Sequence, residues 1–213
     1  MFDLAATIQG LVIQVPVFLL ALTIHECAHG WVAYRLGDPT AKQQGRLTLN
    51  PLAHLDPIGL LAIVFIHFGW AKPVPVDARY FRQPRRDMVL VALAGPLSNA
   101  VLAVAAAFCF QMIPWLSLLT PGSAWLILPV ARVIKSSVLV NVVLAVFNLL
   151  PVPPLDGSRV VSGLLPLPQA IAYSRVEPYG FIILFLLFFS GAMDHILWPP
   201  VQLLTVALFR MWG

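Results

Sequence analysis

Residues 25–29 of this 213-residue chain read His-Glu-Cys-Ala-His, which is an H-E-x-x-H motif. In a helix, side chains four positions apart lie one above the other, so His25 and His29 can bind the same zinc ion. Glu26 lies one position further round the helix and can accept a proton from a zinc-bound water molecule. The motif therefore predicts zinc-assisted hydrolysis, with Glu26 as the catalytic base. The alternative is a structural polar cluster facing a helix bundle.

A catalytic zinc ion usually has three protein ligands and one open position, so one ligand must come from elsewhere in the chain. The candidates are Asp156, His54, Asp56, His67, Glu177, Asp194 and His195. Asp156 is favoured because it lies just after the apolar segment 131–150 breaks at its expected cytoplasmic end, at the membrane depth expected for the two histidines. Gly157 would permit a close approach to the metal. A simple Asp-Gly turn is the alternative.

Three other polar residues are candidates for contacts with a substrate. His54, in a loop expected at the cytoplasmic face, could polarise the scissile carbonyl or stabilise its oxyanion, although a lone loop histidine is equally consistent with surface exposure. Asn99 and Asn148 lie in apolar segments, where an amide needs a partner. Helix joining is the better interpretation for Asn99. Asn148, two turns before Asp156, is the better candidate for the site.

The composition indicates a membrane protein. Hydrophobic residues make up 60% of the chain and charged residues 10%, and the mean hydropathy is +0.88, far above that of a soluble domain. About 20 apolar residues are needed to cross a bilayer as a helix, and three segments qualify: 8–36, 88–113 and 131–150. The first of these is interpreted as structure rather than as a removable signal. Residues 58–69 are too few to cross and predict a re-entrant element.

The remaining segments complete an all-α multi-pass membrane protein of about six helices, including the re-entrant or short segment. Prolines and β-branched residues predict a small extended ribbon near residues 70–80. A kink or break is expected at Gly95 and Pro96, and a connection at 115–130. A loop with Arg159 and Arg175 and two short helices broken at Asp194 and at 199–200 follow. Residues 1–160 form the expected catalytic core, three spans plus the short inserted segment, and 161–213 add C-terminal membrane helices to the same domain.

The basic residues predict the orientation of the chain. The net charge is +4, and Lys and Arg concentrate in two loops rather than in a stripe with interleaved aromatics, which argues against nucleic acid. The two loops contain Arg35, Lys42 and Arg46, and Lys72, Arg79, Arg82, Arg85 and Arg86. Both loops are expected in the cytoplasm by the positive-inside rule, with the charge-free 115–130 segment on the other side. Cys27 and Cys109 are interpreted as small buried hydrophobes.

Four motifs together resemble the site-2 protease family of intramembrane zinc metalloproteases, and they occur in the family's order. They are His25-Glu26-Cys27-Ala28-His29, Asn50-Pro51-Leu52-Ala53-His54-Leu55-Asp56-Pro57, Ala94-Gly95-Pro96-Leu97-Ser98-Asn99, and Asn148 through Pro151 and Pro154 to Leu155-Asp156-Gly157. The resemblance implies one Zn²⁺ per chain with Asp156 as its third ligand, Glu26 as the base, and a six-helix bundle. It also implies that the substrates are transmembrane protein segments cleaved within the bilayer.

The chain is similar to small members of that family without a PDZ domain, so substrate choice is expected to rest on the membrane helices or on partner proteins. We expect a bacterial or archaeal cell membrane, with the active site toward the cytoplasm. Residues 70–76 could offer an extended edge to an unwound substrate, or serve as an interfacial anchor through Trp70 and Lys72. The rival functions are a zinc transporter, which would not need Glu26, and another membrane-embedded zinc hydrolase.

Overall fold

The computed structural model describes residues 4–59, 71–119 and 122–211, and within these ranges it is helical with no β-strand beyond a single bridge between Leu55 and Ala71. The α-helices are α1 (Leu4–Arg35), α2 (Thr40–Gln43), α4 (Pro84–Gln111), α5 (Ile113–Leu119), α6 (Ala124–Asn148), α7 (Asp156–Leu164), α8 (Leu167–Ser174), α9 (Gly180–Phe189) and α10 (Ala192–Arg210). Short 3-10 turns lie at Pro51–His54, Ala78–Tyr80 and Glu177–Tyr179. The predicted all-α class is confirmed.

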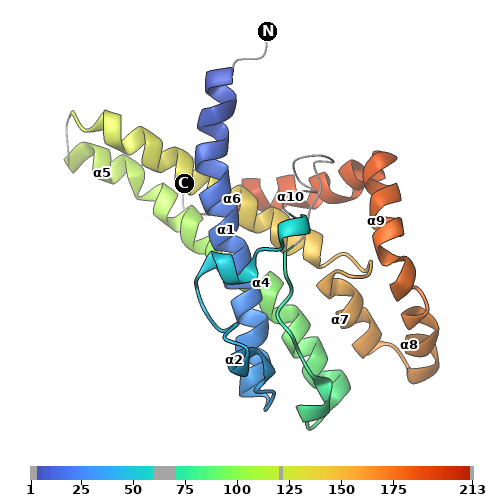
Figure 1. Ribbon diagram of the computed structural model, residues 1–213. Helices are drawn as coiled ribbons and strands as arrows, with labels where there is room; N and C mark the ends of the chain where they lie inside the picture. The colour runs from blue at the N-terminus through green and yellow to red at the C-terminus, as the bar shows by residue number, and fades with distance from the viewer. Residues whose placement is uncertain (1–3, 60–70, 120–121, 212–213) are drawn as a thin grey trace.

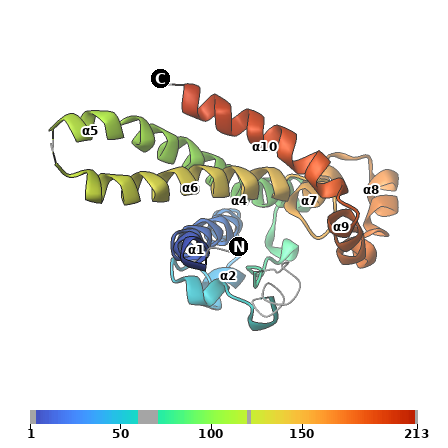
Figure 2. The same cartoon turned by 90° about the horizontal axis from the view of Figure 1, so that it is seen from above.

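Helices α4 and α6 form the middle of the molecule. Helix α1 packs across both on one side and α10 packs on the other side, so the chain is built in layers when seen from above (Figure 2). Small residues on α4, Ala103 and Ala107, are buried against Val138 and Val142 of α6. Small side chains let membrane helices approach closely, and this close packing holds α4 at a fixed position beside α1 and α6.

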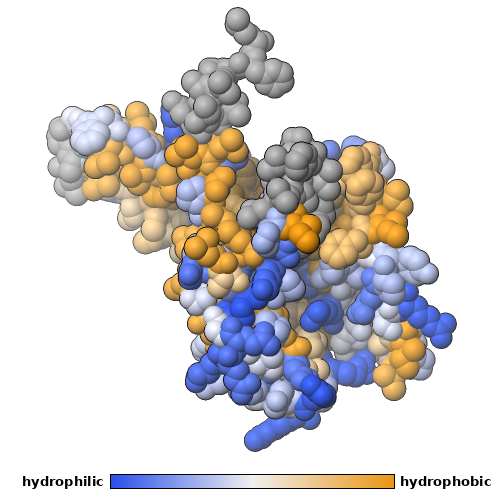
Figure 3. Space-filling model, in the orientation of Figure 1, coloured by the Kyte–Doolittle hydropathy of each residue, from blue (hydrophilic) through white to orange (hydrophobic). Residues whose placement is uncertain are grey.

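Four segments of the described residues are long and apolar enough to cross a membrane: Gly10–Arg35, Pro84–Leu118, Ala124–Asn148 and Leu167–Phe189. The chain is therefore a multi-pass integral membrane protein. Hydrophobic residues cover the upper part of the molecule, and hydrophilic residues gather at the lower end, over α2 and the start of α4 (Figures 1 and 3). Helix α1 ends and α4 begins at this polar end, where Arg35, Arg82, Arg85 and Arg86 are all exposed.

The helix bounds differ from the predicted ones in the middle of the chain. Helix α4 continues through Gly95 and Pro96, so of the predicted kink or break the break is wrong; neighbouring helices commonly make an internal proline tolerable in membranes. The predicted connection at 115–130 is largely helical, because α5 extends to Leu119 and α6 already begins at Ala124. Helix α6 consequently includes the exposed Arg132 and Lys135.

The C-terminal part also differs from expectation. The predicted loop after Asn148 contains two short helices, α7 and α8. The tail forms two helices as expected, but the break between them lies at Ser190 and Gly191, where Gly191 has φ +74°. Only glycine adopts that conformation without strain. Asp194, Pro199 and Pro200 all lie within α10, so the predicted breaks at these residues are wrong.

Residues 72–77 form no regular secondary structure, Asp77 has extended dihedral angles (φ −113°, ψ 102°), and the turn at Ala78–Tyr80 follows, which is consistent with the predicted ribbon. Prolines 73 and 75 favour this extended form because they cannot take part in a regular helix. The predicted re-entrant segment at 58–69 lies almost wholly outside the described residues. The ribbon and the turn at Pro51–His54 lie beside α1, near the residues of the H-E-x-x-H motif.

Candidate metal centre

The structure brings together the two histidines of α1 and the aspartate of α7. Nε2 of His25 lies 3.0 Å from Nε2 of His29, and Oδ2 of Asp156 lies 3.1 Å from the first and 3.2 Å from the second. Among the described residues these three form the group that could hold a metal ion. Of the predicted third ligands, Asp156 is therefore the one that the fold places beside both imidazoles. His67 lies outside the described residues.

Asp156 reaches the histidines because a tight turn joins α6 to α7. The chain leaves α6 after Asn148 and re-enters a helix at Asp156, whose first turn is held by Ser158 Oγ donating to the carbonyl of Leu155 (2.7 Å). A methyl group on Gly157 would overlap the carbonyl of Leu149. Gly157 thus permits close contact with the end of α6, whereas the sequence predicted close contact with the metal.

The backbone fixes which ring nitrogens of the histidines carry protons. Nδ1 of His29 lies 2.7 Å from the carbonyl oxygen of Val91, which can only accept, so this nitrogen donates. Nδ1 of His25 lies 2.6 Å from Oδ1 of Asn99, and the Asn99 amide nitrogen donates to the carbonyl of Ala21 (3.2 Å). When the rings are neutral, as metal ligands must be, each Nε2 therefore presents its lone pair toward Asp156.

A carboxyl group is ordinarily ionised at neutral pH, so Asp156 offers carboxylate oxygens to the two imidazoles. Oδ2 of Asp156 is buried and finds no hydrogen-bond partner, in line with two facing lone pairs. Three electron-rich atoms at this separation repel one another unless a positive charge lies among them. One proton can join only two of them, whereas a metal ion joins all three.

The donor set fits zinc. Imidazole nitrogen and carboxylate oxygen are usual zinc ligands, and bonds of about 2.0–2.1 Å in a tetrahedron place neighbouring ligand atoms about 3.3 Å apart. The three observed separations, 3.0 to 3.2 Å, are close to that edge length. Gly95 of α4 leaves the necessary space, because a methyl group there would come within 2.6 Å of Cε1 of His25 and closer still to both Nε2 atoms.

Glu26 contacts the extended ribbon. Its Oε2 accepts a hydrogen bond from the backbone N–H of Val74 (2.9 Å), and its side chain is partly buried. Because the ribbon supplies this donor, the position of the carboxylate depends on a segment nearly 50 residues further along the chain. The bond fixes one carboxylate oxygen and leaves the other to accept a proton.

The ribbon is itself held by two buried residues of the preceding loop. Asp38 is 0% exposed; its Oδ2 accepts from the N–H of Asp77 (2.7 Å) and its Oδ1 from the N–H and the hydroxyl of Thr40. Arg46 donates to the carbonyls of Lys72 (2.7 Å) and Pro73 (3.3 Å). These bonds anchor both ends of the ribbon next to α1. No sequence pattern distinguishes Asp38, and the sequence gives Arg46 only a role in membrane orientation.

The other candidate residues lie in different surroundings. His54 is 0% exposed, so the surface interpretation is wrong; its Nε2 lies 2.9 Å from the carbonyl of Thr48, and its backbone carbonyl accepts from Lys72 in the ribbon. The amide of Asn148 donates to Leu144 in its own helix. A role for either in binding substrate stays a prediction. Asn99 joins helices as expected, but it also contacts His25.

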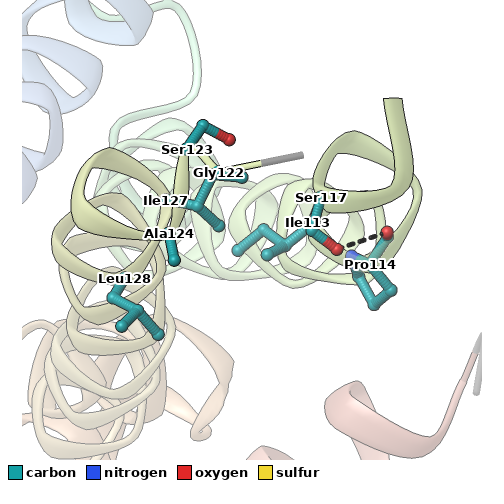
Figure 4. A pocket seen from close by; sticks show the side chains of 8 residues that line it. All are labelled: Ile113, Pro114, Ser117, Gly122, Ser123, Ala124, Ile127 and Leu128. Carbon is teal, nitrogen blue, oxygen red and sulfur yellow. Dashed lines mark hydrogen bonds between the residues drawn. The ribbon is translucent and has the colours of Figure 1, made fainter. Parts of the chain in front are cut away.

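An apolar pocket of about 400 Å³ lies at the far end of the α5–α6 hairpin (Figure 4). Its lining residues are Ile113, Pro114, Ser117, Gly122, Ser123, Ala124, Ile127 and Leu128. The Ser117 hydroxyl donates to the carbonyl of Pro114 (2.7 Å). Ile113 lies 18 residues beyond Gly95, which corresponds to about 27 Å of helix. The pocket is thus separate from the candidate metal centre.

Comparison with known proteins gives matches over most of the chain. Residues 122–191 match the model of a family described as "Peptidase family M50". The chain is 42% identical over 186 residues to "Putative zinc metalloprotease YwhC" of Bacillus subtilis, covering 86% of this chain and 83% of that protein. It is 30% identical over 188 residues to "Putative zinc metalloprotease Rip2" of Mycolicibacterium smegmatis, covering 84% and 67%. No solved structure matches the chain significantly.

Proposed function

Because this chain belongs to peptidase family M50, the site-2 proteases, we propose that it hydrolyses peptide bonds within transmembrane segments of other membrane proteins. In this proposal His25, His29 and Asp156 hold one Zn²⁺, and Glu26 is the general base. The chain is an integral membrane protein with the residues of a hydrolytic zinc motif inside its first span. Its substrates would therefore meet the site within the bilayer.

One observation carries the proposal: two imidazole nitrogens and one carboxylate oxygen converge within 3.0 to 3.2 Å, a distance at which a single proton could join only two of them. Both imidazoles direct their lone pairs inward because their other nitrogens donate, to Val91 and to Asn99. Such an arrangement is unfavourable by itself and becomes favourable around a divalent cation. A structural polar cluster would instead pair donors with acceptors.

The protein groups have separate roles in the proposed reaction. Zinc, when bound, supplies a water molecule of lowered pKa and polarises the scissile carbonyl. Glu26 accepts the proton of the attacking water and passes it to the leaving amine, while the Val74 N–H keeps its carboxylate in place. The imidazole side chains of His25 and His29 are 4% and 10% exposed and the Asp156 side chain 17%, so substrate and water approach from the Asp156 side.

A peptide bond in a regular helix is hidden, because its carbonyl is hydrogen-bonded to the following turn. The substrate must therefore unwind before Glu26 and its water can reach the bond. The extended ribbon beside Glu26 offers backbone groups along which an unwound segment could lie, as strand addition requires. The water comes from the cytoplasm in this proposal, because α1 ends at the basic residue Arg35, about 15 Å along the helix from His25, and the positive-inside rule favours the cytoplasm for that end.

Reconstituted protein and a single-pass membrane substrate test the proposal. We expect the wild type to cleave the substrate within its apolar segment, and a chelator to abolish cleavage. The Glu26→Gln variant should lose about 10²- to 10⁴-fold in rate, because it lacks a general base, while zinc remains bound at one ion per chain. Retained cleavage by this variant would exclude Glu26 as the base. Zinc flux across vesicles without any cleavage would favour the transporter.

A further inference from the structure

A chain of buried amides leads from His25 to helix α6. Oδ1 of Asn99 lies 2.6 Å from Nδ1 of His25, and Nδ2 of Asn99 donates to Oδ1 of Asn141 (2.9 Å) as well as to the carbonyl of Ala21. Nδ2 of Asn141 donates to the carbonyl of Ser137 (2.9 Å). Asn99 is 0% exposed and Asn141 2% exposed. The two hydrogen-bonded amides therefore join α1, α4 and α6 around the imidazole of His25.

The direction of every bond in this chain is fixed by its ends. The carbonyls of Ala21 and Ser137 can only accept, so each must face the NH₂ group of an asparagine. Oδ1 of Asn141 then faces Nδ2 of Asn99, and Oδ1 of Asn99 faces His25. A flip of the Asn99 amide would set its oxygen against two other oxygens, at Ala21 and Asn141. It would also direct an NH₂ group at Nδ1 of His25.

That flip matters because it would move the proton of His25. An NH₂ group facing Nδ1 requires a lone pair there, and the ring proton would then be on Nε2, the atom that faces Asp156. A protonated Nε2 cannot bind a metal ion. Of the two contacts that prevent the flip, one belongs to the backbone of α1 and the other to the side chain of Asn141.

We propose that Asn141 and Asn99 form a relay that keeps Nε2 of His25 unprotonated, so that Asn141 is a positioning residue for the metal centre. This inference rests on the proposed function. Hydrogen-bond partners behind a metal-binding histidine typically change metal affinity 10- to 100-fold when removed. Asn141 acts one step further back, through Asn99, and its hydrogen bonds go to Asn99 and Ser137 rather than to a candidate ligand.

The competing explanation is that these amides only join helices. Gln111 provides a matched control for it, because its amide also joins two helices, donating to the carbonyl of Phe209 (2.6 Å), and it lies at the C-terminal end of α4, 16 residues beyond Gly95. The relay predicts that Asn141 affects both stability and metal affinity, and that Gln111 affects stability alone. Helix joining predicts that both residues affect stability alone.

The test measures zinc affinity by competition with a chelator in detergent, the absorption spectrum of the Co²⁺-substituted protein, and thermal unfolding. We expect Asn141→Leu, and the smaller Asn141→Ala should leucine not fit, to weaken zinc binding about 10-fold or more and to alter the Co²⁺ spectrum. Asn141→Asp loses the donor to the Ser137 carbonyl and should lower the melting temperature, but it retains an acceptor for Asn99 and should bind zinc within a few-fold of the wild type. Gln111→Leu should lower the melting temperature with unchanged zinc affinity.

Wild-type zinc affinity and Co²⁺ spectrum in folded Asn141→Leu or Asn141→Ala, with only a lower melting temperature, would overturn the relay. So would an Asn141→Asp variant as impaired as Asn141→Leu. Absence of stoichiometric zinc binding by the wild type would overturn the proposed function itself. The two failures are therefore distinguished by the wild-type measurement.

Discussion

At the scale of single residues, the candidate centre depends on Gly95, which has no side chain, as much as on the three side chains that converge. Gly95 brings the backbone of α4 against the imidazoles of α1, and the space of one methyl group there is occupied by ring atoms of His25 and His29. Replacing a helical glycine normally stabilises a helix, by about 1 kcal/mol for alanine. At this position the helix preference and the requirements of the metal centre are opposed.

We therefore expect Gly95→Ala to reduce zinc affinity roughly 10- to 100-fold, since overpacking at a tight site costs about 1–3 kcal/mol. Chelator competition measures the affinity, and circular dichroism checks that the helix content is retained. Gly10→Ala, at a glycine of α1 with no heavy atom near the added methyl, is the matched control and should leave zinc affinity unchanged. Unchanged affinity in Gly95→Ala would show that the imidazoles are not confined as described.

Some residues of this site can be identified from the sequence and others cannot, for a physical reason. His25, Glu26, His29 and Asp156 are identifiable because ionisable groups at membrane depth are costly and so stand out. Gly95 has no functional group to attract attention, although it lies in one of the four motifs. Asn141 is one amide in an apolar helix, and its link to His25 through Asn99 exists only once α1, α4 and α6 are packed together.

At the scale of elements, the extended ribbon is the segment that connects the surface loops to the proposed base. Its extended form follows from alternating prolines and β-branched residues, which are visible in the sequence. Its anchors, Asp38 and Arg46, are separated from it by more than 25 residues, so no local pattern reveals them. The same limit applies to helix bounds, because the break at Gly191 depends on a left-handed conformation and not on the nearby prolines.

We expect Asp38→Ala to loosen the ribbon, because the N–H groups of Asp77 and Thr40 lose their acceptor at a buried site. The free energy of unfolding should fall by about 1–3 kcal/mol. Cleavage should slow while zinc stays bound, since Glu26 loses a firmly placed partner but the three metal-facing side chains are untouched. Denaturation, cleavage rate and zinc content are measured together. Arg79→Ala, at an exposed ion pair with Asp77, is the control and should change none of them. Loss of zinc from Asp38→Ala would contradict the separation of roles.

At the scale of the whole molecule, charge and hydropathy place the candidate centre relative to the membrane. On the face shown in Figure 3, hydrophobic residues gather over the upper part of the molecule and hydrophilic residues over its lower end, and the exposed Arg35, Arg82, Arg85 and Arg86 lie where α1 ends and α4 begins. By the positive-inside rule we expect that end to lie in the cytoplasm. The α5–α6 hairpin extends away from the basic end, so the tip of the hairpin is expected on the opposite side of the membrane. The sequence predicted the same side for residues 115–130, but as a loop rather than as helices.

Single cysteines test this orientation, in a protein whose Cys27 and Cys109 are replaced by alanine. The new cysteine of Arg82→Cys, two residues before α4, should react with a membrane-impermeant maleimide only after the cytoplasmic side is opened. A cysteine at Leu118 of α5, which is 73% exposed, should not require opening of that side. Intact cells expose the outer side of the membrane to the reagent, and inverted vesicles expose the cytoplasmic side. Labelling of both positions from the same side would exclude the assigned topology.

The most direct test of the central claim is X-ray absorption at the zinc edge of the purified wild type, compared with Asp156→Ala. We expect one zinc ion per chain, coordinated by two imidazole nitrogens and by oxygen at about 2.0–2.2 Å, with no sulfur at about 2.3 Å. Asp156→Ala should bind zinc more weakly and lose one oxygen ligand. A zinc–sulfur distance, or a spectrum unchanged by Asp156→Ala, would contradict a centre made of His25, His29 and Asp156.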